Sequence, residues 1–188
     1  MALALAWGAG IRVYAVLFLC GIAGWMGWID VPGNLSVLSH PLVLGASGFM
    51  LVVEFFADKV PWIDSVWDAV HTFIRIPAGV ALVAMTFSDS PGAVTAAAAI
   101  LGGAVAAGAH FTKAGARSAI NLSPEPFSNW AASFAEDAAV PAGLWLAVMH
   151  PVVFLALLAA GIVCALLMLR WILGGLRALL HRLRPSGA

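Results

Sequence analysis

Residues 54–79 read EFFADKVPWIDSVWDAVHTFIRIPAG and form the most highly charged segment of this chain. Of the nine Lys and Arg and the nine Asp and Glu in the 188 residues, six fall within these 26 positions. The six are Glu54, Asp58, Lys59, Asp64, Asp68 and Arg75, and His71 lies among them. Since the sequence around them is nearly all apolar, charge gathered here indicates a specific role.

One stripe of polar side chains is predicted if residues 62–75 are helical. Steps of 100° per residue put Asp64, Asp68, His71 and Arg75 within about 60° of arc. Such a stripe can bind a divalent cation, relay protons or pair internally. The alternative is an interfacial helix that shows its charged face to water.

The composition predicts an integral membrane protein. The chain is 63% hydrophobic and only 10% charged, with a mean hydropathy of +1.01, whereas soluble domains carry about a quarter charged residues. Backbone groups in lipid must be satisfied internally, which favours helices. We therefore expect an all-α bundle whose partner is the lipid bilayer, and the zero net charge gives no reason to expect a nucleic acid.

Apolar runs long enough to cross a bilayer, about 20 residues each, divide the chain into six segments. Polar or proline-containing turns separate them, and His150-Pro151 splits the last long run because proline interrupts a helix. The predicted crossings are residues 13–29, 41–57, 73–87, 93–111, 130–149 and 151–169. They make one bundle over residues 1–173, followed by a basic tail over residues 174–188. The fourth crossing, rich in Ala and Gly, is expected to be a central packing helix.

Positive charge predicts the orientation. In the six-crossing arrangement every Lys and Arg lies on or near one side, and Asp30 and Asp89 lie on the other. The positive-inside rule then puts both termini in the cytoplasm, which suits the inner membrane of a bacterium. The apolar N-terminus has no basic segment or cleavage site, so the first helix is expected to be retained. The chain is also expected to form homo-oligomers.

Two further features concern pairs of segments. IPAGVALVAM at residues 76–85 is similar to VPAGLWLAVM at residues 140–149, which suggests duplicated hairpins. Glu136 and Asp137 precede the second copy much as Arg75 precedes the first, so Arg75 is expected to pair with Glu136 or Asp137. Cys20 and Cys164 lie in apolar runs and are expected to be core thiols rather than a disulfide.

The central segment, with Gly10-Ile11-Arg12 upstream, resembles the signature of a family of small bacterial membrane proteins, domain of unknown function 4126. The resemblance covers most of the chain. It implies a compact multi-pass bundle and no established activity.

The function predicted from these residues is a small transporter or channel for cations, either divalent metals or solutes coupled to protons. No nucleophile elbow, P-loop, dinucleotide fingerprint or HExxH motif is present. The alternatives are a metal-dependent intramembrane enzyme and a non-catalytic membrane scaffold. Asp64, Asp68 and His71 are the predicted metal ligands. The full set predicted to bind an ion or substrate is Glu54, Asp58, Asp64, Asp68, His71, Arg75, Glu136 and Asp137.

Overall fold

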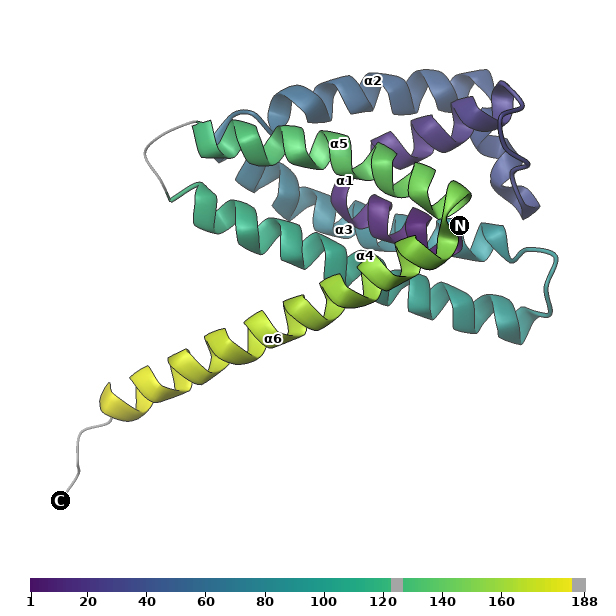
Figure 1. The fold of residues 1–188 in the computed structure, drawn as a ribbon. Coiled ribbons are helices and arrows are strands. Elements are labelled where there is room, and N and C mark those ends of the chain that lie inside the picture. Colours follow the sequence, from purple (N-terminus) through teal and green to yellow (C-terminus); the bar gives the residue numbers. More distant parts are fainter. Residues whose placement is uncertain (123–126, 184–188) are drawn as a thin grey trace.

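The computed structural model describes residues 1–122 and 127–183, which form helices and connecting loops without a strand (Figure 1). The predicted all-α fold is confirmed. The elements are α1 (Ala2–Trp25), the 3-10 helix η1 (Gly33–Ser39), α2 (Pro41–Ala57), α3 (Pro61–Thr86), α4 (Gly92–Ile120), α5 (Phe127–Met149) and α6 (Pro151–Leu183).

Proline begins three of these helices, at Pro41, Pro61 and Pro151. The first helical position suits proline because its missing N–H would have no partner there. The His40 side chain caps α2 by accepting a hydrogen bond from the backbone N–H of Leu42 at 3.2 Å. The predicted bounds of α2 and the predicted break between α5 and α6 are confirmed.

The number of membrane-spanning candidates differs from the six predicted. Within residues 1–122 and 127–183, four helical stretches are long and apolar enough to cross a bilayer: 2–25, 61–86, 92–120 and 151–171. A fifth candidate is the pair η1 and α2, which is bent by 72°. The charged stripe and the predicted crossing at 73–87 are parts of one 26-residue helix, α3.

Helix α1 folds back on itself at Arg12. Its second arm corresponds to the predicted crossing at 13–29 but ends at Trp25, and the prediction missed the first arm over residues 2–11. Arg12 has extended backbone angles, φ −144° and ψ 87°, within an otherwise helical stretch. A Cβ placed on Gly8 would lie 2.6 Å from a methyl group of Val16. Residues eight apart in a straight helix are separated by about 12 Å, so the two halves of α1 form a hairpin with Arg12 at its tip.

The two ends of the bundle differ in chemistry. At one end, here called the η1 end, η1, the α3–α4 connection and the start of α6 lie together with both arms of α1 (Figure 1). At the other, the charged end, the α2–α3 connection meets the end of α4 and the start of α5. The start of α1 and the end of α6 are therefore far apart. The predicted location of both termini in the cytoplasm stays a prediction.

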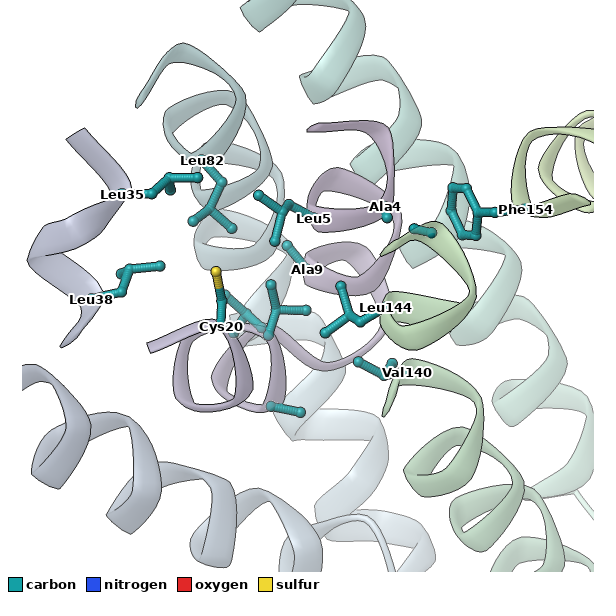
Figure 2. Packing of buried hydrophobic residues seen from close by; sticks show 14 residues of the cluster. Ala4, Leu5, Ala9, Cys20, Leu35, Leu38, Leu82, Val140, Leu144 and Phe154 are labelled. Atoms are coloured by element: carbon teal, nitrogen blue, oxygen red, sulfur yellow. The ribbon is translucent and has the colours of Figure 1, made fainter. Parts of the chain in front are cut away.

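The apolar core lies at the η1 end (Figure 2). Leu5 and Cys20, from the two arms of α1, pack there with Leu35 of η1, Leu82 of α3 and Leu144 of α5. Cys20 is buried as predicted, whereas Cys164 is exposed on α6 and is not a core thiol.

Helix α4 packs closely through its small residues, which confirms its predicted role. A Cβ on Gly10 of α1 or on Gly79 of α3 would collide with Ala106 of α4. Helix α3 also turns apolar side chains outward, with Phe73 82% exposed. An apolar exterior around a polar interior is the arrangement expected of a helix in lipid.

A buried charge network as the candidate functional site

Eleven charged side chains meet at the charged end and form a continuous set of ion pairs, here called the charge network. Its members come from α1, α3, α4, α5 and the end of α2. The cations are Arg12, Lys59, Arg75, Lys113 and Arg117, and the carboxylates are Glu54, Asp58, Asp64, Asp68, Glu136 and Asp137.

The polar stripe of α3 is formed as predicted, and it faces the protein rather than water. Asp64 and Arg75 are fully buried, and Asp68 and His71 are 4% and 3% exposed. The alternative of an interfacial helix with its charged face in water is wrong, because α1 and α4 cover this face. Charges withdrawn from water are costly unless they are paired, and the stripe is paired by cations from α4 and from α3 itself.

Lys113 is the central cation. Its Nζ lies 3.3 Å from Asp58, 3.4 Å from Asp68 and 3.3 Å from Glu136. It also donates a hydrogen bond to the backbone carbonyl of Ile11 at 3.2 Å. The ammonium of Lys113 thus connects four segments: the C-terminal end of α2, helix α3, helix α5 and the tip of the α1 hairpin.

The tip of the hairpin places a second buried cation beside Lys113. Arg12 lies 2.9 Å from Asp58, 3.2 Å from Asp137 and 3.6 Å from Glu136. It also donates to the backbone carbonyl of Ser133 at 3.2 Å. A break in a helix leaves carbonyls without their usual partners. Here Lys113 donates to the carbonyl of Ile11.

Arg75 pairs with acids of α2 and α3. Its Nη2 lies 2.8 Å from Glu54, and its Nη1 donates to Asp68. The predicted pairing of Arg75 with Glu136 or Asp137 is wrong. Those two acids are bound by Arg12, Lys59, Lys113 and Arg117 instead, because the hairpin tip of α1 lies next to α5.

Arg117 connects the last turn of α4 to the neighbouring chain segments. It lies 3.0 Å from Asp64 and donates to the backbone carbonyls of Asp58 and Asn129, each at 2.7 Å. Asn121, one turn further along, donates to Asp64 at 2.8 Å. The α2–α3 connection and the start of α5 are therefore attached to α4 by charge-assisted hydrogen bonds, which are stronger than neutral ones.

Lys59 lies at the edge of the network, between α2 and α3. Its ammonium lies 3.4 Å from Asp137 and 3.2 Å from the centre of the Phe55 ring, a cation–π contact. Burial lowers the pKa of Lys59, and the carboxylate of Asp137 opposes that shift.

His71 lies beside the network in a defined tautomer. Its Nδ1 is 2.8 Å from the backbone carbonyl of Trp67, which only accepts, so Nδ1 carries the proton. In the neutral ring, Nε2 then accepts a hydrogen bond from the Tyr14 hydroxyl at 3.2 Å. The Trp67 ring stacks on His71 with centroids 4.2 Å apart.

The predicted metal site is not assembled. Among the residues that the structure describes, no three His, Cys, Asp or Glu side chains are arranged to hold a metal ion. The reason is that each expected ligand has another partner. Asp64 binds Arg117, Asp68 binds Arg75 and Lys113, and His71 binds Tyr14 and the Trp67 backbone.

The network contains one more carboxylate than it has cations. Five buried carboxylate oxygens accept no hydrogen bond from the described residues. Two of them, Asp64 Oδ1 and Glu136 Oε2, lie within 4 Å of a cation. The other three are Glu54 Oε2, Asp58 Oδ1 and Asp68 Oδ2. An unpaired polar atom in a low-dielectric interior costs about 1–3 kcal/mol. Both facts favour the uptake of a proton or another small cation by this cluster.

All eight residues predicted from the sequence to bind an ion or substrate lie in or beside the network. The prediction missed His110, Lys113 and Arg117 of α4, which are buried members or neighbours of it. Their spacing of three and then four residues places them on one helical face, the same signal that identified the stripe of α3. It also missed Arg12 as a participant.

The comparisons with known proteins identify a family without a function. Residues 1–171 match the family model described as domain of unknown function DUF4126. No curated protein and no solved structure matches the chain.

Proposed function

The chain belongs to the DUF4126 family, and for this member we propose a function as a small membrane transporter or channel that carries protons, alone or coupled to a solute. Glu54 is the proton-binding group and the charge network is its setting. The observation that carries the proposal is the surplus carboxylate in a buried cluster, with Glu54 as the acid that has the fewest partners.

Glu54 is fully buried, and its ion pair is with Arg75 through Oε1. Its second oxygen, Oε2, accepts no hydrogen bond from the described residues. A proton on Oε2 removes the excess negative charge while leaving the contact with Arg75 in place. Asp58, by comparison, lies within 4 Å of three cations, Arg12, Lys113 and Arg117.

The hairpin at Arg12 supports transport over a purely structural bundle. In many transporters, broken helices present backbone carbonyls and dipoles at membrane depth, where they handle ions. In α1 the first arm ends at Ile11, and its carbonyl end faces the cations Lys113 and Arg12. A cation at the C-terminal end of a helix is favoured by the helix dipole.

The proton is favoured over a divalent metal because the carboxylates do not form a group of three ligands among the described residues. A hard divalent cation prefers six or more oxygen ligands or nearly ideal octahedral geometry. A proton needs one carboxylate oxygen.

For orientation we assign the charged end to the cytoplasmic face of a bacterial inner membrane. Lys59 and the end of α4, with Arg117, lie at this end. Basic residues gather on the cytoplasmic side of membrane proteins. The start of α1, which carries no Lys or Arg before Arg12, then lies on the opposite face.

Infrared spectroscopy of the purified protein in lipid tests the proton site. We expect the carbonyl band of a protonated carboxylic acid at neutral pH, and we expect Glu54→Gln to abolish it. Asp89→Asn, which changes an exposed acid in the α3–α4 connection, is the matched control and retains the band. A band that survives in Glu54→Gln rejects Glu54 as the proton-binding group.

Proteoliposomes test transport itself. Wild-type protein should dissipate an imposed pH gradient faster than empty vesicles, and Glu54→Gln should lower the rate to that of empty vesicles while Asp89→Asn does not. Equal rates for wild-type protein and empty vesicles, across a panel of cationic and neutral solutes, would reject the transport proposal.

A non-catalytic scaffold is the second candidate, and one observation favours it. The ion pairs connect five segments of the chain, so the network also holds the bundle together. For a scaffold, no solute should move through either the wild-type protein or Glu54→Gln. The combination of a proton band with transport separates the two functions.

A further inference from the structure

A cavity of about 170 Å³ opens between α3 and α4. It lies along the first turns of α3 and the last turns of α4, close to the charged end. The lining residues are Ser65, Asp68, Ala69, Thr72, His110, Phe111, Ala114, Arg117 and Ser118.

The floor of the cavity belongs to the charge network. Asp68, His110 and Arg117 line it and are 4%, 1% and 2% exposed. Thr72 forms part of the wall and hydrogen-bonds to His110 Nε2 at 2.7 Å. The cavity therefore reaches buried ionisable groups that are otherwise enclosed by helices.

Its rim is polar on the side nearest the charged end. Ser65 lies one turn after the start of α3, and Ser118 lies two residues before the end of α4. Both are exposed and line the cavity. The amide of Asn121 reaches the Ser65 hydroxyl at 3.1 Å. Hydroxyl and amide groups at this position suit contact with water rather than with lipid chains.

Volume and lining together suit water. A water molecule occupies about 30 Å³ in the liquid and needs two to four polar partners, so the cavity has room for several. Hydroxyl groups of Ser65, Thr72 and Ser118 and the charged groups of the floor supply these partners.

We propose that this cavity is a water-filled side entrance through which protons from the charged end reach Asp68. A proton that binds Asp68 weakens its pair with Arg75. Because Arg75 also holds Glu54, protonation of Asp68 alters the partner of Glu54. The route to Glu54 rests on the proposed function, whereas the hydration of the cavity does not.

Cysteine labelling tests the hydration. The background variant is Cys20→Ala with Cys164→Ala, and single cysteines replace Ser65, Thr72 or Ser118. Each is treated in sealed vesicles with a charged, membrane-impermeant methanethiosulfonate reagent, applied from each side in turn. Thiols react as thiolates, which form in water and not in lipid. We expect Thr72→Cys to react from the charged-end side only, at least about tenfold faster than a lipid-facing control.

Phe73→Cys is the matched control. Residue 73 is next to Thr72 on α3, but its side chain is 82% exposed on the outer surface. Reaction of Thr72→Cys no faster than Phe73→Cys would reject a water-filled cavity. So would reaction of Thr72→Cys with lipophilic N-ethylmaleimide alone, which would indicate that lipid fills the space.

A second measurement tests the route to Glu54. After a pH jump at the charged end, modified Thr72→Cys should show a slower change in the Glu54 carboxyl band than unmodified Thr72→Cys. An unchanged rate would reject the entrance as the proton route and leave the labelling result intact. Labelling repeated in Glu54→Gln should give the same pattern, so failure of the proton proposal is distinguished from failure of the cavity.

Discussion

Lys113 contacts carboxylates from three different segments of the chain: Asp58, Asp68 and Glu136. Its side chain is 2% exposed, so its charge is not shared with solvent. Removing one partner from a buried ion pair leaves an uncompensated charge, which is more harmful than never burying the pair. The position of this one ammonium therefore determines whether three acids can be buried together.

Lys113→Met should accordingly destabilise the protein by about 3–5 kcal/mol. Lys59→Met is the control, because Lys59 is 16% exposed at the edge of the network and should cost less. Denaturant unfolding in lipid or detergent micelles measures both. Equal losses in the two variants would contradict the central role of Lys113.

Arg75 offers a test of charge compensation. Arg75→Gln alone leaves Glu54 without its cation and should cost about 3–5 kcal/mol. Adding Glu54→Gln removes the acid that has lost its ion-pair partner, so the double variant should be more stable than Arg75→Gln. A double variant that is less stable than the single one would show that Glu54 does not depend on Arg75.

At the level of residues, the sequence predicted which acidic residues lie close together, but not which basic residues form ion pairs with them. The stripe of α3 could be predicted because its spacing is local and follows from helix geometry. Partners such as Arg12 and Asp137 are 125 positions apart in the chain, and their contact depends on how α1 folds. No local pattern fixes that distance.

Among the helices, α1 departs most from its expected form. Gly8 and Gly10 lie just before the turn at Arg12 and allow one arm of the hairpin to touch the other arm and α4. Since apolar residues continue through the turn, hydropathy alone cannot distinguish a hairpin from a straight crossing. The charge at Arg12 was the available signal, because an arginine in mid-helix requires partners.

Gly10→Ala tests the contact between α1 and α4. The new Cβ would collide with the Ala106 carbonyl and the Ala109 methyl group, and overpacking of this kind typically costs about 1–3 kcal/mol. Gly108→Ala is the control, because a Cβ there meets nothing within 4 Å and alanine favours the helix. Thermal unfolding should show a loss for Gly10→Ala and no loss for Gly108→Ala.

For the molecule as a whole, the hairpin changes the relation between the ends of the chain. Both arms of α1 reach the η1 end, and α6 runs away from that end with most side chains of residues 151–171 exposed (Figure 1). A bundle with one re-entrant hairpin keeps its basic residues at the charged end without requiring the N-terminus to be there. The general class of fold was predictable from composition, whereas the hairpin in α1 was not.

Protease accessibility of tags measures this arrangement. A tag before Met1 and a tag inserted between Asp89 and Ser90 should be cleaved from the same side of sealed vesicles, and a tag after Ala188 should be cleaved from the other. If the tag before Met1 and the tag after Ala188 were cleaved from the same side, α1 would be a straight crossing and the hairpin would be rejected.

The hydrogen bond between Lys113 and the Ile11 carbonyl has a consequence for biosynthesis, because its two residues are 102 positions apart. At about 5–20 residues per second, a ribosome needs roughly 5–20 s to make the intervening chain. During that interval the Ile11 carbonyl lacks its partner in α4. The contact between the tip of the hairpin and Lys113 therefore forms only after α4 has been made, although the hairpin itself is the first segment to be synthesised.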